Sequence, residues 1–378
     1  MTSLRAIGWP YDSMFDESRS DEGRSDEGGP EEAAWREAMA AHPQARPARV
    51  IEQHRSGYVV AEGPDEGFRV ESPPDWQRPR FSAQDRAAVG DWVLIEGGAI
   101  VVLLPRRTAI KRGAAGEHYK QQVIAANIDT VFVVCGLDAD FNPRRIERYL
   151  LLVRSGGSEP VIVLTKADRA IADDVQAIDS AMAALIDLAA QDVAVRAVNA
   201  KDRDSVAVLE PWLLPGRTIV LVGSSGAGKS TLTNTLLGSE RMKIGDVRVS
   251  DSRGRHTTTH RALIPLPSGA CMIDTPGMRE LKPTGEEDIA DAGFADIETL
   301  AEQCKFRDCR HEREPGCAVR AAIESGKLDP DRYANYVKLR DEVAGAAGKL
   351  ATRLAQKAGE RVTGKALNKR LDDKYGKH

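Results

Sequence analysis

The spacing of hydrophobic and polar positions changes along the chain and divides it into regions. Residues 46–112 contain short apolar runs separated by Gly, Pro and Asp turns, namely RVIEQ, GYVVAE, FRVES, DWVLIE and AIVVLLP. Short runs of this kind, rich in β-branched residues, predict strands. Five strands in so small a region predict a small β-barrel, for which an oligonucleotide-binding (OB) fold is one candidate.

A different pattern follows in residues 113–283, where apolar runs alternate with helical stretches. Strands are predicted at TVFVVCG, PVIVLTKAD, VAVRAVNA, TIVLVGSS and ACMIDTPG, and helices at residues 145–153 and 172–190. Such alternation is typical of a parallel sheet with helices on both faces. We therefore expect an α/β domain in this region.

The remaining regions have weaker patterns. Residues 1–45 include SRSDEGRSDEGGPEE and offer almost nothing to a core, which predicts a disordered acidic extension. Residues 284–345 predict a small, mainly helical domain, and residues 346–378 predict a basic tail that is partly helical at best. The chain is thus predicted to be multidomain.

The amino-acid composition indicates which class of protein to expect. Of the 378 residues, 42% are hydrophobic and 29% are charged, and the formal net charge is −4. These values are ordinary for a soluble globular protein. Because no apolar run approaches the ~20 residues that span a bilayer, we expect a cytoplasmic protein that does not bind membranes.

The strongest chemical signal is the segment Gly223–Ser230, GSSGAGKS, which fits the pattern G-x-x-x-x-G-K-[ST]. It follows the apolar run TIVLV and opens the helical stretch STLTNTLL, flanks that a chance glycine-rich turn would lack. Backbone N–H groups at such a helix N-terminus bind phosphate, Lys229 is predicted to reach the β- and γ-phosphates, and Ser230 is predicted to bind magnesium. The predicted nucleotide contacts of this phosphate loop are Gly223, Ser224, Ser225, Gly226, Ala227, Gly228, Lys229, Ser230 and Thr231.

Base recognition is predicted at Thr165-Lys166-Ala-Asp168, after the run PVIVL. A carboxylate at Asp168 can accept hydrogen bonds from guanine N1–H and its exocyclic amine, which favours GTP over ATP. The stem of Lys166 can lie along the base. TKAD alone could also be a strand that ends in a capped turn, so an ATP-dependent P-loop enzyme remains an alternative. The segment VNAK at residues 198–201 is a further candidate contact.

Magnesium and the γ-phosphate have two more candidate segments. Asp274, in DTPG, can hold magnesium, usually through water, and the N–H of Gly277 can sense the γ-phosphate. Residues 253–260, RGRHTTTH, predict a switch loop in which a threonine, assigned to Thr258, completes the magnesium shell. An ordinary surface loop is the alternative for this segment.

The order of these segments is unusual, because TKAD precedes the phosphate loop. A doubly wound sheet tolerates such a circular permutation, since the ligand contacts strand ends whatever their order in the chain. The switch loop and DTPG then lie near the end of the α/β domain. Whatever follows them is predicted to be mechanically coupled to the nucleotide.

Three of the five cysteines form a cluster with a histidine in CKFRDCRHEREPGC, namely Cys304, Cys309, His311 and Cys317. Three thiolates and one imidazole suit tetrahedral zinc, and a complete set of four protein ligands indicates one structural ion. An odd cysteine count in a reducing compartment argues against disulfides. Buried thiols without a metal are the alternative.

The β-barrel followed by TKAD, GSSGAGKS, GRHTTT, DTPG and the Cys/His cluster resembles the bacterial ribosome small subunit-dependent GTPase A family (RsgA, also called YjeQ), over roughly residues 46–340. The resemblance implies an OB barrel, a permuted GTPase domain and a zinc domain. It also implies binding to the small ribosomal subunit and its rRNA during late maturation, with hydrolysis of GTP to GDP and phosphate stimulated by the subunit. We expect a monomer.

Two positions depart from the usual pattern. Thr165 replaces the Asn that commonly begins the base-reading segment, which leaves the bracing of that loop in question. Met278 stands where a Ras-like enzyme has a water-orienting Gln, which predicts slow turnover by the isolated protein. His256 is the candidate that positions water alongside the catalytic Lys229, with His260 in reserve. His256 could instead be an exposed loop residue, and the protein an RNA-binding assembly factor that uses GTP as a timer with little turnover.

Overall fold

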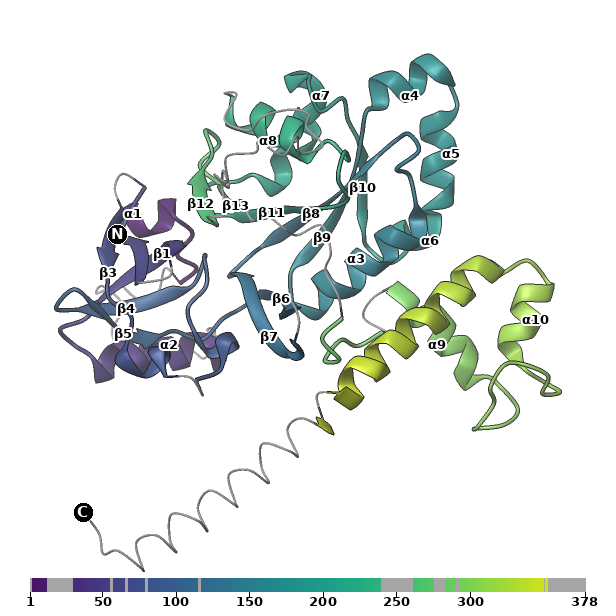
Figure 1. The fold of residues 1–378 in the computed structure, drawn as a ribbon. Coiled ribbons are helices and arrows are strands. Elements are labelled where there is room, and N and C mark those ends of the chain that lie inside the picture. The colour runs from purple at the N-terminus through teal and green to yellow at the C-terminus, as the bar shows by residue number, and fades with distance from the viewer. Residues whose placement is uncertain are drawn as a thin grey trace, which may run out of the picture.

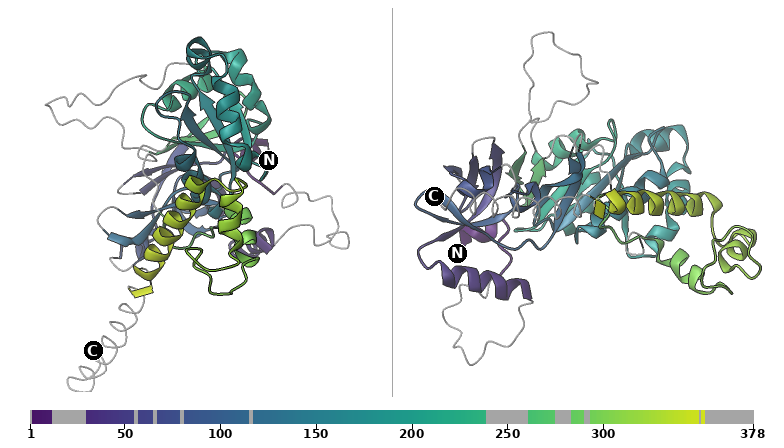
Figure 2. Two further views of the ribbon diagram at one scale, coloured as in Figure 1. Left: turned by 90° about the vertical axis from the view of Figure 1, so that its right-hand side faces the viewer. Right: turned by 60° about the horizontal axis from the view of Figure 1, so that its bottom comes forward.

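The protein is described by a computed structural model with three spatially distinct parts: a β-rich part, a central α/β part and a helical part (Figure 1). The β-rich and helical parts lie at opposite ends of the central sheet, as a second view also shows (Figure 2). The structure describes residues 2–11, 30–54, 57–64, 67–78, 81–114, 117–238, 261–274, 283–289, 293–349 and 351–352.

The β-rich part confirms the five strands predicted in residues 46–112. They are β1 (Arg46–His54), β2 (Gly57–Ala61), β3 (Gly67–Val70), β4 (Trp92–Glu96) and β5 (Ala99–Leu103). β1 pairs antiparallel with β2 and β4, β2 pairs with β3, and β4 pairs with β5. A parallel bridge between Glu71 and Ala99 joins the end of β3 to β5, so the pairing returns to β1.

The central part is a mostly parallel sheet with the strand order β10-β9-β8-β11-β13-β12. The first five strands are parallel to their neighbours, whereas β12 is antiparallel to β13. The strands are β8 (Thr130–Gly136), β9 (Glu159–Thr165), β10 (Ala194–Ala197), β11 (Thr218–Val222), β12 (Ala262–Pro265) and β13 (Cys271–Asp274). The five predicted strands are confirmed, and β12 was not predicted.

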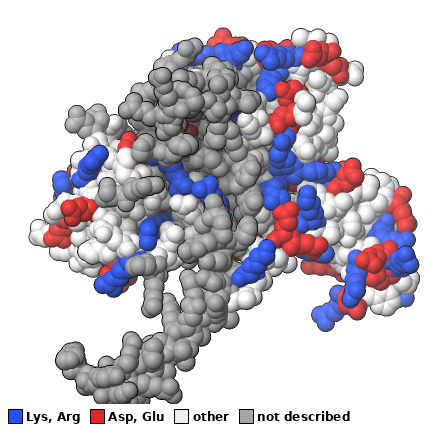
Figure 3. Space-filling view, viewed as in Figure 1, with Lys and Arg blue, Asp and Glu red and all other residues white. Residues whose placement is uncertain are grey.

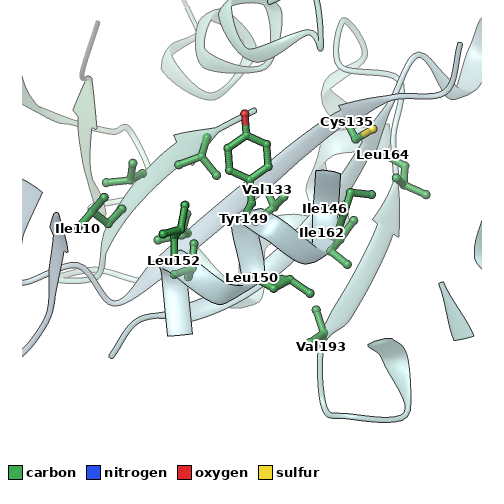
Figure 4. Close-up of a cluster of buried hydrophobic side chains, with 14 of the residues drawn as sticks. Ile110, Val133, Cys135, Ile146, Tyr149, Leu150, Leu152, Ile162, Leu164 and Val193 are labelled. Carbon is green, nitrogen blue, oxygen red and sulfur yellow. The ribbon is translucent and has the colours of Figure 1, made fainter. Parts of the chain in front are cut away.

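Helices cover both faces of this sheet, as the alternating pattern predicts. They are α3 (Pro143–Ser155), α4 (Ala167–Asp173), α5 (Ala177–Ala184), α6 (Ile186–Ala189), α7 (Arg203–Val206), the 3-10 helix η5 (Ala207–Trp212) and α8 (Lys229–Leu237). Successive side chains of a strand point to opposite faces. Val133 of β8 therefore packs with α3, as Figure 4 shows, whereas Val134 packs in the cluster that contains Leu232 of α8.

A hairpin that was not predicted connects the β-rich part to the sheet. Its strands are β6 (Ala109–Ala114) and β7 (Glu117–Ala126). The predicted boundary between residues 112 and 113 falls inside β6, so the two domains do not separate at that point. The buried side chain of Ile110 belongs to the core that packs beneath α3 (Figure 4).

The expectation that residues 1–45 are a disordered extension is wrong for the described part of that region. Residues 2–11 contain α1 (Thr2–Ala6), and α2 (Pro30–Ala41) follows. The rings of Trp9 and Trp35 are buried, and the Trp9 ring lies edge-on to Trp35 at 5.1 Å and to Trp92 of β4 at 4.8 Å. A few large aromatic side chains bury much apolar area without producing a periodic pattern, which is why the sequence did not reveal them. Most of the acidic repeat lies outside the described residues.

The C-terminal part is mainly helical. It contains α9 (Ala295–Glu302), α10 (Ala318–Glu324) and a helix over residues 330–349. The last helix continues past the predicted boundary at residue 345, and residues 353–378 of the predicted tail lie outside the described residues. Across the described segments, no helix is both long and apolar enough to cross a bilayer.

Candidate functional site

The parallel strands bring the predicted nucleotide segments to one edge of the sheet. GSSGAGKS follows β11, TKAD begins at the last residue of β9, VNAK follows β10, and Asp274 ends β13. Carboxyl ends of parallel strands share an edge, where ligands of doubly wound folds bind. Segments far apart in the sequence therefore converge there.

Between β11 and α8 the phosphate loop turns at glycines whose φ angles are positive. Gly228, which precedes α8, has a φ of 93°. A Cβ atom at Gly223 would lie 2.1 Å from the Val134 carbonyl oxygen, so no larger residue fits. The ammonium group of Lys229 folds back and donates to the carbonyl oxygens of Gly223 at 2.7 Å and Ser224 at 2.5 Å.

The base-reading segment is hydrogen-bonded to the phosphate loop. Thr165 is completely buried, and its hydroxyl donates to the Ala227 carbonyl oxygen at 2.6 Å. The N–H of Ala167 donates to the carbonyl oxygen of Val198 at 3.2 Å, which joins TKAD to VNAK. The hydroxyl of Thr165 thus braces the loop despite the absence of an amide at this position.

Lys166 and Asp168 lie where this segment turns into α4. Lys166 has a left-handed backbone (φ 63°), and its ammonium lies 2.5 Å from a carboxylate oxygen of Asp138. Partial burial would raise the pKa of Asp138, but hydrogen bonds from Lys166 and from the Asp140 N–H lower it below its usual value. Asp168 is exposed in the first turn of α4, where a bound base could reach it.

Asp138 and Asp140 are two residues that the motif analysis missed. Both lie in the loop between β8 and α3, and Asp140 accepts a hydrogen bond from the Ser224 hydroxyl of the phosphate loop. Their signal in the sequence is the run DADFN, directly after a buried strand whose carboxyl end lies at the ligand edge.

Asp274 and Ser230, at the start of α8, are the predicted magnesium ligands in the described part of the chain. Asp274 ends β13, which pairs parallel with β11 and so lies beside the strand that leads into the phosphate loop. Burial raises the pKa of Asp274. A bound cation would offset this cost of burial, as expected of a magnesium site. The predicted residues His256, Thr258 and Gly277, together with Met278, lie outside the described residues.

The four predicted zinc ligands converge in the helical part. The ligand atoms of Cys304, Cys309, His311 and Cys317 all lie within 4.8 Å of one another. The His311 Nδ1 atom is 3.5 Å from the Cys304 sulfur and 3.4 Å from the Cys317 sulfur, and these two sulfurs are 3.9 Å apart. Tetrahedral zinc bonds of about 2.3 Å to sulfur and 2.0 Å to nitrogen require ligand atoms roughly 3.5–3.8 Å apart. The side chains therefore fit a single zinc ion.

The cluster is held by the helices around it. Cys317 caps α10, where its sulfur accepts from the Arg320 N–H at 3.4 Å, and Cys304 follows α9. His311 has a left-handed backbone (φ 63°), and its ring lies edge-on to Tyr333 of the last helix. The candidate metal site thus joins three helices of a small module.

Comparison with known proteins gives the same family for the central part and for the whole chain. The RsgA GTPase family model matches residues 103–284. The small ribosomal subunit biogenesis GTPase RsgA of Xanthomonas axonopodis pv. citri (strain 306) is 66% identical over 376 residues, which cover 100% of this chain and 98% of the relative. RsgA of Xanthomonas campestris pv. campestris (strain B100) is 67% identical over 363 residues, or 96% of this chain and 94% of the relative.

Two solved structures share the fold. YjeQ from Thermotoga maritima is 25% identical with a TM-score of 0.57, covering 80% of this chain and 99% of its own. YloQ, described as a circularly permuted GTPase, is 26% identical with a TM-score of 0.55, covering 80% of this chain and 96% of its own. The permuted order of the sequence segments is therefore matched by a permuted structure.

Proposed function

The chain belongs to the RsgA GTPase family, and we propose that it binds GTP across the ligand edge of the sheet with the residues described above. It is a P-loop GTPase of small ribosomal subunit biogenesis, the activity named for its relatives. The hydrogen bond from Thr165 to Ala227 carries the assignment of the site. It holds the base-reading segment against the phosphate loop, although the two are far apart in the sequence and the base-reading segment comes first.

Hydrolysis is attack of water on the γ-phosphate of GTP. The N–H groups of the phosphate loop hold the phosphates, and Lys229 leaves its carbonyl partners to neutralise charge on the transferring phosphoryl group. Ser230 and Asp274 would hold magnesium, which supplies further positive charge when it is bound with GTP. Thr258 and Gly277 are proposed, from sequence, to contact the magnesium and the γ-phosphate.

Guanine selectivity is assigned to Asp168. Its carboxylate accepts from two donors on guanine that adenine does not offer in the same arrangement. Lys166, held by Asp138, supports the base along its aliphatic stem. This arrangement favours GTP over ATP.

Turnover is proposed to depend on the ribosome. Met278 offers a thioether where a Gln would orient water, so the isolated protein lacks that group. His256 is the candidate that completes the site on the small subunit. Slow hydrolysis alone and fast hydrolysis on the subunit are the expected behaviour.

RNA binding is proposed for the two end parts. The ring of strands β1 to β5, closed by the Glu71–Ala99 bridge, supports an OB-like barrel. The Cys/His module is proposed to hold one structural zinc ion. It exposes Lys305, Arg307, Arg310 and Arg313 around the cluster, and Figure 3 shows basic side chains among acidic ones on this module. Such cations bind phosphate in a salt-dependent manner.

The test is GTP hydrolysis by the purified protein, alone and with small ribosomal subunits, with ATP in parallel. We expect slow hydrolysis of GTP, strong stimulation by the subunits and no comparable use of ATP. Lys229→Ala is the control and should lower the stimulated rate by about a hundredfold or more. Equal use of ATP would contradict the role of Asp168, and an unchanged rate on subunits would contradict ribosome-dependent turnover. Full function of Lys229→Ala in subunit maturation would favour the timer alternative.

A further inference from the structure

The loop between β8 and α3, residues 137–142, contacts both halves of the proposed nucleotide site. Asp138 pairs with Lys166 of the base-reading segment at 2.5 Å. Asp140 accepts from the Ser224 hydroxyl of the phosphate loop, with both of its carboxylate oxygens at 2.6 Å. None of the nucleotide-binding motifs contains this loop.

The carboxylate of Asp140 is fixed from several directions. The guanidinium of Arg145, in the first turn of α3, lies 2.8 Å from one oxygen, and the Gly136 N–H donates to the other at 3.3 Å. The side chain of Asp140 is only 15% exposed. Because Arg145 compensates its charge, the carboxylate can lie beside a loop that binds phosphate. Charge-assisted hydrogen bonds of this kind are short and directional.

Ser224 carries this constraint to the lysine of the phosphate loop. Its hydroxyl is held by Asp140, while its own carbonyl oxygen accepts from the Lys229 ammonium at 2.5 Å. The position of Ser224 therefore sets the starting point from which Lys229 reaches the phosphates. Transition-state stabilisation depends on placing such a group to within about 0.5 Å.

We propose that Asp140 is a positioning residue of the GTPase reaction, which holds the phosphate loop and Lys229 in place through Ser224. The inference rests on the proposed function, since it assigns Asp140 a role in the same site. In this assignment Asp140 acts on the reaction through Ser224. Its loss should therefore lower kcat more than it raises KM.

The experiment uses the full-length protein with small ribosomal subunits and measures kcat and KM for GTP. The variants are Asp140→Ala, Asp140→Asn, Ser224→Ala and the double variant Asp140→Ala with Ser224→Ala. The control is Asp179→Ala, an exposed aspartate on α5. Thermal unfolding of each variant separates a loss of folding from a loss of positioning.

Asp140→Ala and Ser224→Ala should each lower kcat about tenfold, the typical effect of losing a hydrogen bond to a charged group. KM should change by less than about twofold. The double variant should be no slower than Asp140→Ala, because both changes remove the same contact. Asp140→Asn should retain part of the rate, since its amide oxygen still accepts from Ser224.

Three results would overturn the inference while leaving the proposed function intact. In the first, the wild-type protein hydrolyses GTP and the kcat values of Asp140→Ala and Ser224→Ala both equal that of Asp179→Ala. The effects of the two single changes could instead multiply in the double variant, or the loss could appear only in KM. Where Asp140→Ala fails to fold, Asp140→Asn and Ser224→Ala provide the test, and a rate equal to that of Asp179→Ala in both variants would overturn the inference. Absence of GTP hydrolysis by the wild-type protein would reject the proposed function and this inference together.

Discussion

Thr165 is a completely buried residue whose hydroxyl links two loops of the proposed nucleotide site. A Cβ atom at Gly228 would lie 2.9 Å from the Thr165 hydroxyl oxygen, so the two loops pack closely as well as sharing a hydrogen bond. A short hydroxyl side chain suits this narrow gap. The hydroxyl group of Thr165 and the small size of both residues therefore matter to the site.

Thr165→Val keeps the shape of this side chain and removes its donor. The Ala227 carbonyl oxygen would lose its partner in a buried place, which costs about 1–3 kcal/mol. We expect GTP to bind about tenfold more weakly, measured by titration with a fluorescent GTP analogue. Thr165→Ser keeps the hydroxyl and should bind nearly as wild type. Equal affinities of the Val and Ser variants would show that the hydroxyl does not brace the loop.

At the scale of elements, α3 serves two cores with two faces. Ile146, Tyr149 and Leu150 pack under the sheet, as Figure 4 shows, whereas Leu151 belongs to the core of the C-terminal module. On the second face, Glu147 pairs with Arg332 of the last helix at 3.2 Å, and both side chains are at most 2% exposed. Because its two faces pack in different cores, α3 joins the GTPase part to the Cys/His module.

Breaking this buried pair should be costly. Glu147→Ala removes a buried carboxylate partner of Arg332, although Asp296 still accepts from that guanidinium at 2.7 Å. We therefore expect a loss of about 1.5–3 kcal/mol, the contribution of a hydrogen bond to a charged group. Urea unfolding followed by circular dichroism measures the effect. Arg148→Ala, also on α3, removes a partly exposed ion pair with Glu342 of the last helix and should cost less than about 1 kcal/mol. Comparable losses for the two variants would argue against a special role of burial here.

Removal of zinc should unfold the Cys/His module. A structural ion that joins α9, α10 and the last helix contributes directly to folding of the module. We expect one zinc per chain by metal analysis, and loss of helical content from the module after strong chelation. Cys317→Ser should lower the zinc content, whereas Cys135→Ser, outside the cluster, should not. Protein purified without zinc and with an intact module would contradict the assignment.

For the whole molecule, the joint between the β-rich part and the central sheet is built from segments that are distant in the sequence. The buried guanidinium of Arg49 donates to the carbonyl oxygens of Ile7, Gly90 and Asn127. β1 also pairs with β12 through Glu52 and Ala262, so strand pairing continues from the β-rich part into the central sheet. The N-terminal segment thus fixes how the β-rich part sits on the GTPase part.

Trp9→Ala tests this role of the N-terminal segment. Removal of a buried tryptophan from the cluster with Trp35 and Trp92 should destabilise the protein by about 3–5 kcal/mol. Thermal and urea unfolding of the full chain provide the measurement. Phe68→Ala, at a partly exposed ring on β3, should cost less than about 1 kcal/mol. A neutral Trp9→Ala would mean that the segment rests on the surface without stabilising it.

Local sequence patterns predicted β1 to β5, β8 to β11 and β13, together with the phosphate-loop motif, the TKAD segment and the Cys/His cluster, but they did not predict β6, β7 or β12. Each predicted feature is a local pattern, in which strand alternation, glycine conformation or ligand spacing is encoded within a few residues. Tertiary structure alone decided the burial of the N-terminal tryptophans, the pairing of β1 with β12 and the contact of Asp140 with Ser224. These features depend on residues distant in sequence, and their energies come from burial and geometry that exist only once the sheet has formed.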